Sequence, residues 1–295
     1  MDHIYDVIIL GAGPAGLSAG LYAGRSRLDT LIIEKGQAGG QIINTDEIEN
    51  YPGQIVEGET GVSLVRRMYE QTEQFGAEHV RDTITDVELN GEIKVLTGEK
   101  DTYQAKNIII ATGAYARPIG CKGEQEYKGR GISYCATCDA HFCKGKDVAV
   151  IAYTKEAEED ASFLSEVCSS IKYFPLYDIS NEIFDKYGNI QIIKDKPIGF
   201  AGNMKAEKII CENSSYDAFS TFVVRNNISA DKLVPGLKTD GTHIIVDLQM
   251  KTNIKGLFAC GDIAGKPYQY IKSAGQGNVA ALSAVAYLAN KSKGE

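Results

Sequence analysis

The chain has 295 residues, of which 43% are hydrophobic, and a formal net charge of −8. This length suits two domains that each bury a core, and no apolar run is long enough to form a transmembrane helix. The acidic balance without a basic tract argues against a nucleic-acid partner, and the seven dispersed cysteines do not form a secreted disulfide framework.

The first predicted strand, residues 5–10, begins almost at the N-terminus and runs directly into a glycine-rich turn. No basic and apolar leader precedes the strand, so we expect a cytoplasmic protein. Within the turn, Gly11 permits the sharp change of direction, and Gly13 lets a pyrophosphate approach the backbone. Gly16 lets the following helix pack closely on the strand.

Pro14 and Ala15 complete the GAGPAG turn, and residues 17–24 continue it as a small, apolar helix. The amides and the dipole at the start of this helix favour phosphate groups. The next predicted strand, residues 30–33, ends at Glu34, the position at which an acid binds ribose hydroxyls. A glycine pattern alone is a weak indication, but strand, helix, strand and acid in this order predict a dinucleotide site.

Cys135 and Cys138 are separated by two residues, so both sulfurs can meet across one turn as a small, reducible ring. The same spacing is also half of a zinc site, for which His141 and Cys143 are the nearest further ligands. The residues by themselves leave a redox disulfide and a zinc site as alternatives.

A second strand suited to a nucleotide fold, residues 147–151, follows these cysteines. Where glycines are expected after the strand, the chain has Ala152 and Thr154, and only the small third residue, Ala157, is kept. The Cβ of Ala152 obstructs a tight turn, and the Thr154 side chain blocks the approach of a pyrophosphate. Tyr153, between them, has the size to fill the vacated space.

The charge of the helix after this turn gives the same indication. Glu156 and Glu158 enter the first helical turn, where a carboxylate takes the favourable dipole position and repels a phosphate. Apolar residues at helical spacing between Ala157 and Cys168 still predict a helix here.

Three more elements are predicted in the C-terminal part of the chain. Residues 243–247, after a turn at 240–242, are expected to return to the first sheet as a strand. Residues 256–262 form a strand that ends in a Gly-Asp pair, and residues 274–281 begin a helix of small residues that can approach a cofactor.

Together with the GAGPAG turn and Glu34, the segments 39–41, 49–53, 108–114 and 256–262 resemble the low-molecular-weight thioredoxin reductase family. The resemblance extends over most of the chain. It implies an FAD-containing homodimer that passes electrons to thioredoxin. It also implies an α/β fold with two Rossmann-like, three-layer ββα domains, in which the FAD domain is split by an inserted central domain.

On this pattern, residues 1–114 and 240–295 form the discontinuous FAD-binding domain. Residues 115–239 form the central insert, a degenerate NAD(P)-binding-like domain that carries the CxxC pair near its start.

The resemblance also implies the contacts with FAD. Asp262 would bond the ribityl chain, whereas Gln269 and Tyr270 would lie at the pyrimidine edge of the flavin. Asn50 and Ile84 would line the cofactor. The full set of expected cofactor-binding residues is Gly11, Gly13, Pro14, Ala15, Gly16, Glu34, Gly40, Gln41, Asn50, Ile84, Ala111, Thr112, Gly113, Asp262, Gln269 and Tyr270.

The CATCD segment that ends at Asp139 matches the family's redox motif and favours a flavin-coupled disulfide over zinc. By resemblance, Cys138 faces the flavin and Cys135 is its partner. Asp139 is the expected acid that protonates the leaving thiolate, provided that burial raises its pKa.

Cys143 departs from the family and is either a resolving or regulatory thiol or a small residue in a packed turn. His141 either assists proton transfer or is an ordinary loop histidine.

NADPH-using members of the family carry Gly-x-Gly-x-x-Ala in the central domain and a His-Arg-Arg cluster after the next strand. Here that strand, residues 171–174, leads to Asp178 without an arginine, so NADPH is not expected to bind. A branch of the family in anaerobes and photosynthetic microbes lacks the same motifs, and reduced ferredoxin supplies electrons to its better understood members. The sequence therefore predicts a ferredoxin-dependent flavin thioredoxin reductase.

Two alternatives stay open. One is a related enzyme whose donor is unknown or is NADH. The other is a non-catalytic flavoprotein redox sensor, against which the retained cysteines and Asp139 argue.

The family has an arginine where Tyr268 stands, so the flavin environment or the donor interface is expected to differ. An acidic ferredoxin would need a basic patch, for which the candidates are Arg25, Arg27, Lys35, Arg66 and Arg67.

Overall fold

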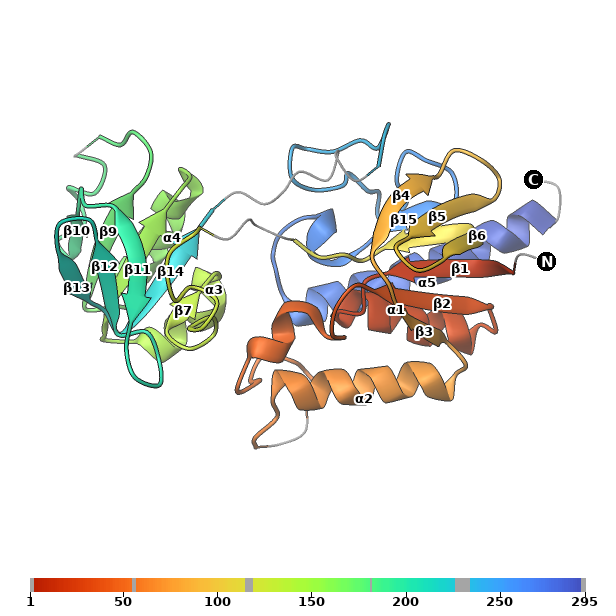
Figure 1. Cartoon of the computed structure of the whole chain (residues 1–295), viewed down its shortest axis with the longest axis horizontal. Helices are drawn as coiled ribbons and strands as arrows, with labels where there is room; N and C mark the ends of the chain where they lie inside the picture. Colours follow the sequence, from red (N-terminus) through yellow and green to blue (C-terminus); the bar gives the residue numbers. More distant parts are fainter. Residues whose placement is uncertain (1–2, 55–56, 115–118, 181, 226–233, 293–295) are drawn as a thin grey trace. The chain divides into compact units, whose positions relative to one another are not determined.

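The computed structural model describes residues 3–54, 57–114, 119–180, 182–225 and 234–292. The chain divides into two compact units, residues 1–115 with 228–295 and residues 116–227. Figure 1 shows the first unit in red to yellow and blue, and the second unit mainly in green. The predicted domain boundary at Tyr115 lies outside the described residues.

The first unit is built on a seven-stranded sheet in the order β3-β2-β1-β6-β5-β4, with β15 paired to β6. Only the pairs β4–β5 and β5–β6 are antiparallel. Strand β6 joins the antiparallel part of the sheet to the parallel part, because its first half pairs with β5 and its second half pairs with β15. The strands are β1 Ile4–Leu10, β2 Thr30–Glu34, β3 Glu78–Arg81, β4 Ile84–Glu88, β5 Lys94–Gly98, β6 Thr102–Ile110 and β15 Leu257–Ala259.

Helices α1 (Pro14–Arg25), α2 (Gly61–Gln74) and α5 (Tyr270–Ser292) pack on one face of this sheet (Figure 1). In β1, Val7 and Ile9 belong to the core on the helix side, whereas Ile8 belongs to the core on the opposite face. Burial on both faces explains why residues 7–10 of the strand are all apolar. Each fully buried aliphatic side chain stabilises the fold by roughly 1.5–3 kcal/mol.

The second unit repeats this design with a parallel sheet in the order β10-β9-β8-β14-β7 and a separate antiparallel sheet in the order β11-β12-β13. Apolar residues of α3 and α4 pack on one face of the parallel sheet, and the antiparallel sheet covers the other. The elements are β7 Ile132–Ser133, α3 Ala136–Asp139, β8 Asp147–Ala152, α4 Glu156–Ser165, β9 Ser170–Pro175, β10 Ile190–Ile192, β11 Pro197–Ala201, β12 Lys208–Cys211, β13 Ser215–Asp217 and β14 Ser220–Val224. Both units therefore have the predicted Rossmann-like α/β architecture.

Two expectations about the C-terminal part need correction. Residues 243–247 form no strand, and only an isolated bridge joins Ile244 to Thr239. The Asp247 carboxylate accepts hydrogen bonds from the backbone of residues 249 and 251 and holds this segment in a loop. The insert also ends before Val234 rather than at Thr239, because Val234 is buried in the core of the first unit.

Within the described residues, no helix is both long enough and apolar enough to cross a bilayer. The longest, α5, carries polar residues along its length, including Lys272, Gln276 and Asn290.

Candidate active site

The turn between β1 and α1 requires two of its glycines for steric reasons. Gly11 has φ +106°, and a Cβ there would lie 2.5 Å from the Ala111 carbonyl oxygen. A Cβ on Gly16 would lie 1.8 Å from the carbonyl oxygen of Gly11. The turn can therefore fold back against β6 only with glycine at both positions.

The rest of this turn forms an open cradle. A Cβ on Gly13 would meet nothing closer than the Gly39 carbonyl oxygen at 3.9 Å, and Gly113 faces open space at φ +74°. Gly40 lies opposite Gly13, since a Cβ on Gly40 would be 3.6 Å from the Gly13 Cα. Pro14 occupies the first helical position of α1, where its missing N–H costs no hydrogen bond.

Glu34 ends β2 beside the same turn. Its carboxylate accepts hydrogen bonds from the backbone N–H of Ala12 and of Gly36, both at 2.9 Å. The Asp82 N–H donates to the Glu34 carbonyl oxygen at 3.1 Å, so the chain leads from this edge into β4, which begins at Ile84. Ile84 is half-buried against the core on the sheet face away from the helices.

The carboxyl end of β6 contributes a further group of predicted residues. Ala111 is buried, and the Thr112 hydroxyl oxygen is buried without a hydrogen-bond partner among the described residues. The Gln41 side-chain amide donates to the Ala114 carbonyl oxygen at 2.9 Å and links the segment after β2 to this end of the sheet.

Asp262 lies in the short 3₁₀ turn Gly261–Ala264 after β15. The Ser273 hydroxyl donates to its carboxylate at 3.0 Å, and burial raises the pKa of the Asp262 carboxyl. The Lys272 ammonium donates to the Gly261 carbonyl oxygen at 2.8 Å, and burial lowers the pKa of this lysine. The first turn of α5 therefore holds the loop that carries Asp262.

The predicted pyrimidine-edge residues lie next to the segment after β2. The Asn50 side-chain amide donates to the Gln269 side-chain oxygen at 3.5 Å, and the hydroxyls of Tyr270 and Thr45 are 3.0 Å apart. The structure thus brings Asn50 and Gln269 together although they are far apart in the chain. Tyr268 lies outside this pair, and its hydroxyl is 2.7 Å from His243 Nε2.

The residues of this unit fit FAD on three observations. The open backbone at Gly13 and Gly113 leaves room for a pyrophosphate, and the unsatisfied Thr112 hydroxyl can bond to a bound group. Glu34 presents a carboxylate at the end of the second strand, where ribose hydroxyls bind in dinucleotide folds. The individual contacts stay predictions.

In the second unit, Cys135 and Cys138 are joined by a disulfide with their Cα atoms 5.4 Å apart. Asp139 follows as the last residue of α3 and is largely buried, and this burial raises the pKa of its carboxyl. A pKa raised by burial is what the predicted role of Asp139 as a proton donor requires.

Ser133 was not identified from the sequence, although it connects the redox pair to the acid. Its hydroxyl donates to Asp139 Oδ2 at 2.6 Å and accepts a hydrogen bond from the Cys135 N–H at 3.1 Å. The bond to Asp139 lowers the pKa of the carboxyl and so moderates the effect of burial. A serine two residues before a CxxC has no recognisable pattern, and only the fold of β7 into α3 shows its position.

The zinc alternative does not agree with this arrangement. The sulfurs of Cys135 and Cys138 are bonded to each other, and His141 is exposed. Cys143 is 2% exposed in the apolar core of the unit, where burial raises the pKa of its thiol. In the described part of the chain, no group of three or more His, Cys, Asp or Glu side chains is placed to hold a metal. Cys143 thus has the surroundings of a small core residue.

The turn between β8 and α4 contains side chains where the first unit has an open cradle. The Thr154 hydroxyl donates to the Glu156 carboxylate at 2.5 Å, and the first turn of α4 carries three acidic residues, Glu156, Glu158 and Glu159. A single cation, Lys155, precedes them. Tyr153 does not fill the turn as suggested, because its ring packs against the core on the antiparallel-sheet side.

The end of β9 is also occupied by the chain itself, through a tyrosine pair that the sequence did not indicate. The Tyr177 hydroxyl donates to Glu158 Oε1 at 2.7 Å and lies 2.8 Å from the Tyr173 hydroxyl. Burial raises the pKa of Tyr177 to about 12; the bond to Tyr173 lowers this pKa and the bond to Glu158 raises it. Glu158 therefore anchors Tyr177 rather than pointing freely into the turn.

Several candidates for a basic patch are already paired. Arg67 forms an ion pair with the buried Glu59, and Arg66 lies 3.8 Å from Glu70. Arg25 lies over the ring of Phe75 at 5.3 Å. These three side chains therefore do not form an unpaired basic patch.

Comparisons with known proteins agree with this architecture. A family model described as pyridine nucleotide-disulphide oxidoreductase matches residues 5–152, and one described as glucose inhibited division protein A matches residues 240–292. The thioredoxin reductase of Peptoclostridium acidaminophilum is 39% identical, with 98% of each chain covered. The crystal structure of thioredoxin reductase from Streptococcus pyogenes has a TM-score of 0.90 at 32% identity and covers 98% of this chain and all of that one. A ferredoxin-flavin thioredoxin reductase structure from Clostridium acetobutylicum has a TM-score of 0.58 at 38% identity, with 98% and 99% covered.

Proposed function

The chain belongs to the thioredoxin reductase family of pyridine nucleotide-disulphide oxidoreductases, and from this premise we propose that it takes electrons from reduced ferredoxin rather than from NADPH. Its cofactor is FAD, and its redox-active group is the Cys135–Cys138 disulfide. The oxidised protein substrate that this class implies is thioredoxin. By the same resemblance, we propose a cytoplasmic homodimer.

The observation that carries the proposal is the turn after β8. Thr154 and Glu156 bond to each other where a pyrophosphate would need bare backbone, and three carboxylates stand at the start of α4. A dinucleotide phosphate would meet both steric obstruction and like charge. The similar ferredoxin-flavin thioredoxin reductase of Clostridium acetobutylicum gives the proposal further support.

The second supporting observation lies at the end of β9, where NADPH-using relatives have a basic cluster. Here Tyr177 is bonded to Glu158, so this position has a carboxylate and a neutral hydroxyl. Neither group can neutralise the 2′-phosphate that distinguishes NADPH from NADH.

The residues around the disulfide have defined tasks in this proposal. FAD, when bound, supplies the electron pair that reduces the disulfide. Reduction breaks the Cys135–Cys138 bond and gives two thiols, which requires two protons and two electrons. Asp139, whose pKa is raised by burial, donates one of these protons to the leaving sulfur, and Ser133 holds its carboxyl in place. The resulting dithiol then reduces the disulfide of thioredoxin by thiol–disulfide exchange.

The proposal is tested with FAD-loaded protein under anaerobic conditions, by adding NADPH, NADH or reduced ferredoxin and following flavin absorbance. We expect reduced ferredoxin alone to bleach the flavin, and thioredoxin to restore the colour as it is reduced. Rapid bleaching by micromolar NADPH contradicts the proposal. Bleaching by ferredoxin without thioredoxin turnover favours the non-catalytic redox sensor instead.

A further inference from the structure

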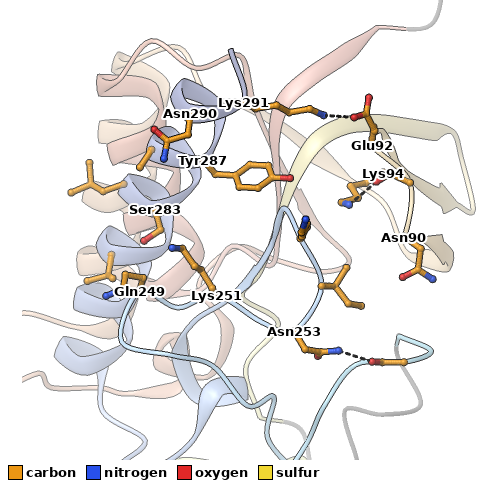
Figure 2. Close-up of a pocket in the computed structure, with 17 residues that line it drawn as sticks. Asn90, Glu92, Lys94, Gln249, Lys251, Asn253, Ser283, Tyr287, Asn290 and Lys291 are labelled. Atoms are coloured by element: carbon orange, nitrogen blue, oxygen red, sulfur yellow. Dashed lines mark hydrogen bonds and ion pairs between the residues drawn. The ribbon is translucent and has the colours of Figure 1, made fainter. Parts of the chain in front are cut away.

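A groove of about 950 Å³ lies in the first unit and contains none of the residues predicted to bind FAD (Figure 2). Its walls are the β4–β5 hairpin at residues 90–94, residues 249–255 before β15, the second half of α5 at residues 279–291, and Gly236. The lining on α5 begins at Val279, about 13 Å along the helix from Tyr270, and extends to Lys291, at about 1.5 Å per residue. The groove therefore lies along the second half of α5, whereas the predicted flavin residue Tyr270 is in its first turn.

The lining of the groove is basic although the chain as a whole carries a net charge of −8. Among the described residues that line it, the cations are four lysines, Lys94, Lys251, Lys255 and Lys291, and Glu92 is the one carboxylate. Glu92 is engaged by Lys291 at 3.4 Å, as Figure 2 shows. A concentration of one sign of charge in a concave site attracts ligands of the opposite sign.

Lys94 is the most unusual of these residues, because its side chain is 3% exposed. Its ammonium donates to the Gly91 carbonyl oxygen at 2.7 Å, and no carboxylate of the described chain lies within ion-pair distance of it. Burial lowers the pKa of Lys94, and the nearby charge of Lys291 lowers it further. A buried ammonium without a counter-ion is costly, and a bound anion would remove that cost.

The groove also offers groups suited to an organic ligand. Tyr287 projects from α5 toward the hairpin, and its ring is held edge-on against Phe258 with the centroids 6.5 Å apart (Figure 2). Asn90 and Asn290 present side-chain amides on opposite walls. Small-molecule sites have volumes of about 300–1,000 Å³ and combine apolar or aromatic walls with a few polar groups.

We propose that this groove binds a phosphate-bearing nucleoside, with its phosphates at Lys94 and Lys251 and its base beside Tyr287. Lysine is a common phosphate ligand, and aromatic rings stack on nucleobases. The asparagine amides supply the donors and acceptors that a base or a ribose needs. This site is separate from the flavin site and from the degenerate turn after β8, and its occupation does not depend on the electron donor.

The test is calorimetric titration of FAD-loaded full-length protein with ADP and, separately, with inorganic pyrophosphate. Full loading with FAD prevents ADP from entering the flavin site. We expect ADP to bind and the Kd to rise at least about tenfold in Lys94→Met and in Lys251→Glu. Lys194→Met, an exposed lysine of the second unit, is the matched control and should change the Kd by less than about twofold. Lys251 is exposed, so Lys251→Glu stays informative if Lys94→Met does not fold.

Three results overturn the proposal. Absence of ADP binding at millimolar concentration removes the site altogether. Equal affinity in wild type and both groove variants places the ligand elsewhere. Pyrophosphate binding as tight as ADP binding, with no loss of ADP affinity in Tyr287→Leu, leaves no role for a nucleoside.

Discussion

The two units contain the same strand–turn–helix design, but the turn of the first unit has open backbone and the turn of the second contains side chains and carboxylates. After β1, the backbone at Gly13 faces open space, and the end of β2 presents Glu34. After β8, the Thr154 side chain occupies the corresponding turn and is bonded to Glu156. The comparison shows that the strand and the helix of a nucleotide fold can persist around a turn that is filled by side chains.

The unit with the altered turn has nevertheless kept its redox chemistry. Cys135, Cys138 and the largely buried Asp139 lie at the start of the same sheet, supported by Ser133. The proposed loss of nucleotide binding is compatible with the retained disulfide because the two sites use different strand ends, those of β8 and β7.

The largest effect is expected when the redox chemistry itself is removed. Cys138→Ser should reduce thioredoxin turnover by at least about 10³-fold, because no disulfide remains to accept electrons. FAD content, measured by absorbance, should be unchanged since the residues predicted to bind FAD lie in the other unit. Cys143→Ala is the matched control and should keep most activity. An equal loss in Cys143→Ala would make that buried thiol a redox partner instead of a core residue.

The contrast between the two turns is tested by placing the same carboxylate in each. Gly13→Asp should weaken FAD binding by roughly 10³-fold, because a charge about 4 Å from a phosphate at an effective dielectric constant near 20 costs about 4 kcal/mol. Thr154→Asp should leave ferredoxin-driven thioredoxin reduction unchanged, since that turn is expected to bind no phosphate. Retention of FAD by Gly13→Asp, or loss of activity in Thr154→Asp, would remove the proposed difference between the turns.

Asp139→Asn should lower turnover by about 10²-fold, the usual contribution of a general acid. Because the folded pKa of Asp139 is raised, its proton is held at low pH and lost as pH rises through that pKa, so wild-type turnover should fall on the alkaline side. The stabilisation linked to this protonation is lost over the same rise in pH, so Asp139→Asn should melt higher than wild type at neutral pH.

Ser133→Ala sharpens this assignment. The Ser133 hydroxyl lowers the pKa of Asp139, so its removal should move the alkaline limb of the pH–rate profile to higher pH. A profile that does not move would leave Ser133 with a purely structural role.

The smallest expected effect concerns Tyr177, which closes the end of β9. Tyr177→Phe removes the hydrogen bonds to Glu158 and Tyr173 and should cost about 1 kcal/mol of unfolding free energy, visible as a drop of about 2–4 °C in Tm. Turnover with ferredoxin should be unchanged. A large loss of turnover would show that the end of β9 takes part in catalysis.

Local sequence was sufficient for the elements that hold the candidate site. The apolar residues within β1, β2, β6, β8 and β9 are divided between the cores on the two faces of their sheet, and each strand was placed to within a few residues at its carboxyl end. The steric need for glycine at Gly11 and Gly16 is local as well, since it depends on the turn that joins strand to helix. The CxxC spacing alone left a redox disulfide and a zinc half-site open; the match of CATCD to the family's motif favoured the disulfide, and the structure agrees with it.

Only the tertiary structure showed which side chains meet across the chain. Ser133 reaches Asp139, Tyr177 reaches Glu158, and Lys94 and Lys251 line one groove from segments more than 150 residues apart. Arg67 was a candidate for an open basic surface until its pairing with Glu59 was visible. Strand and turn propensities depend on neighbours in sequence, whereas charge pairing and burial of a polar group depend on neighbours in space, and sequence spacing does not encode those.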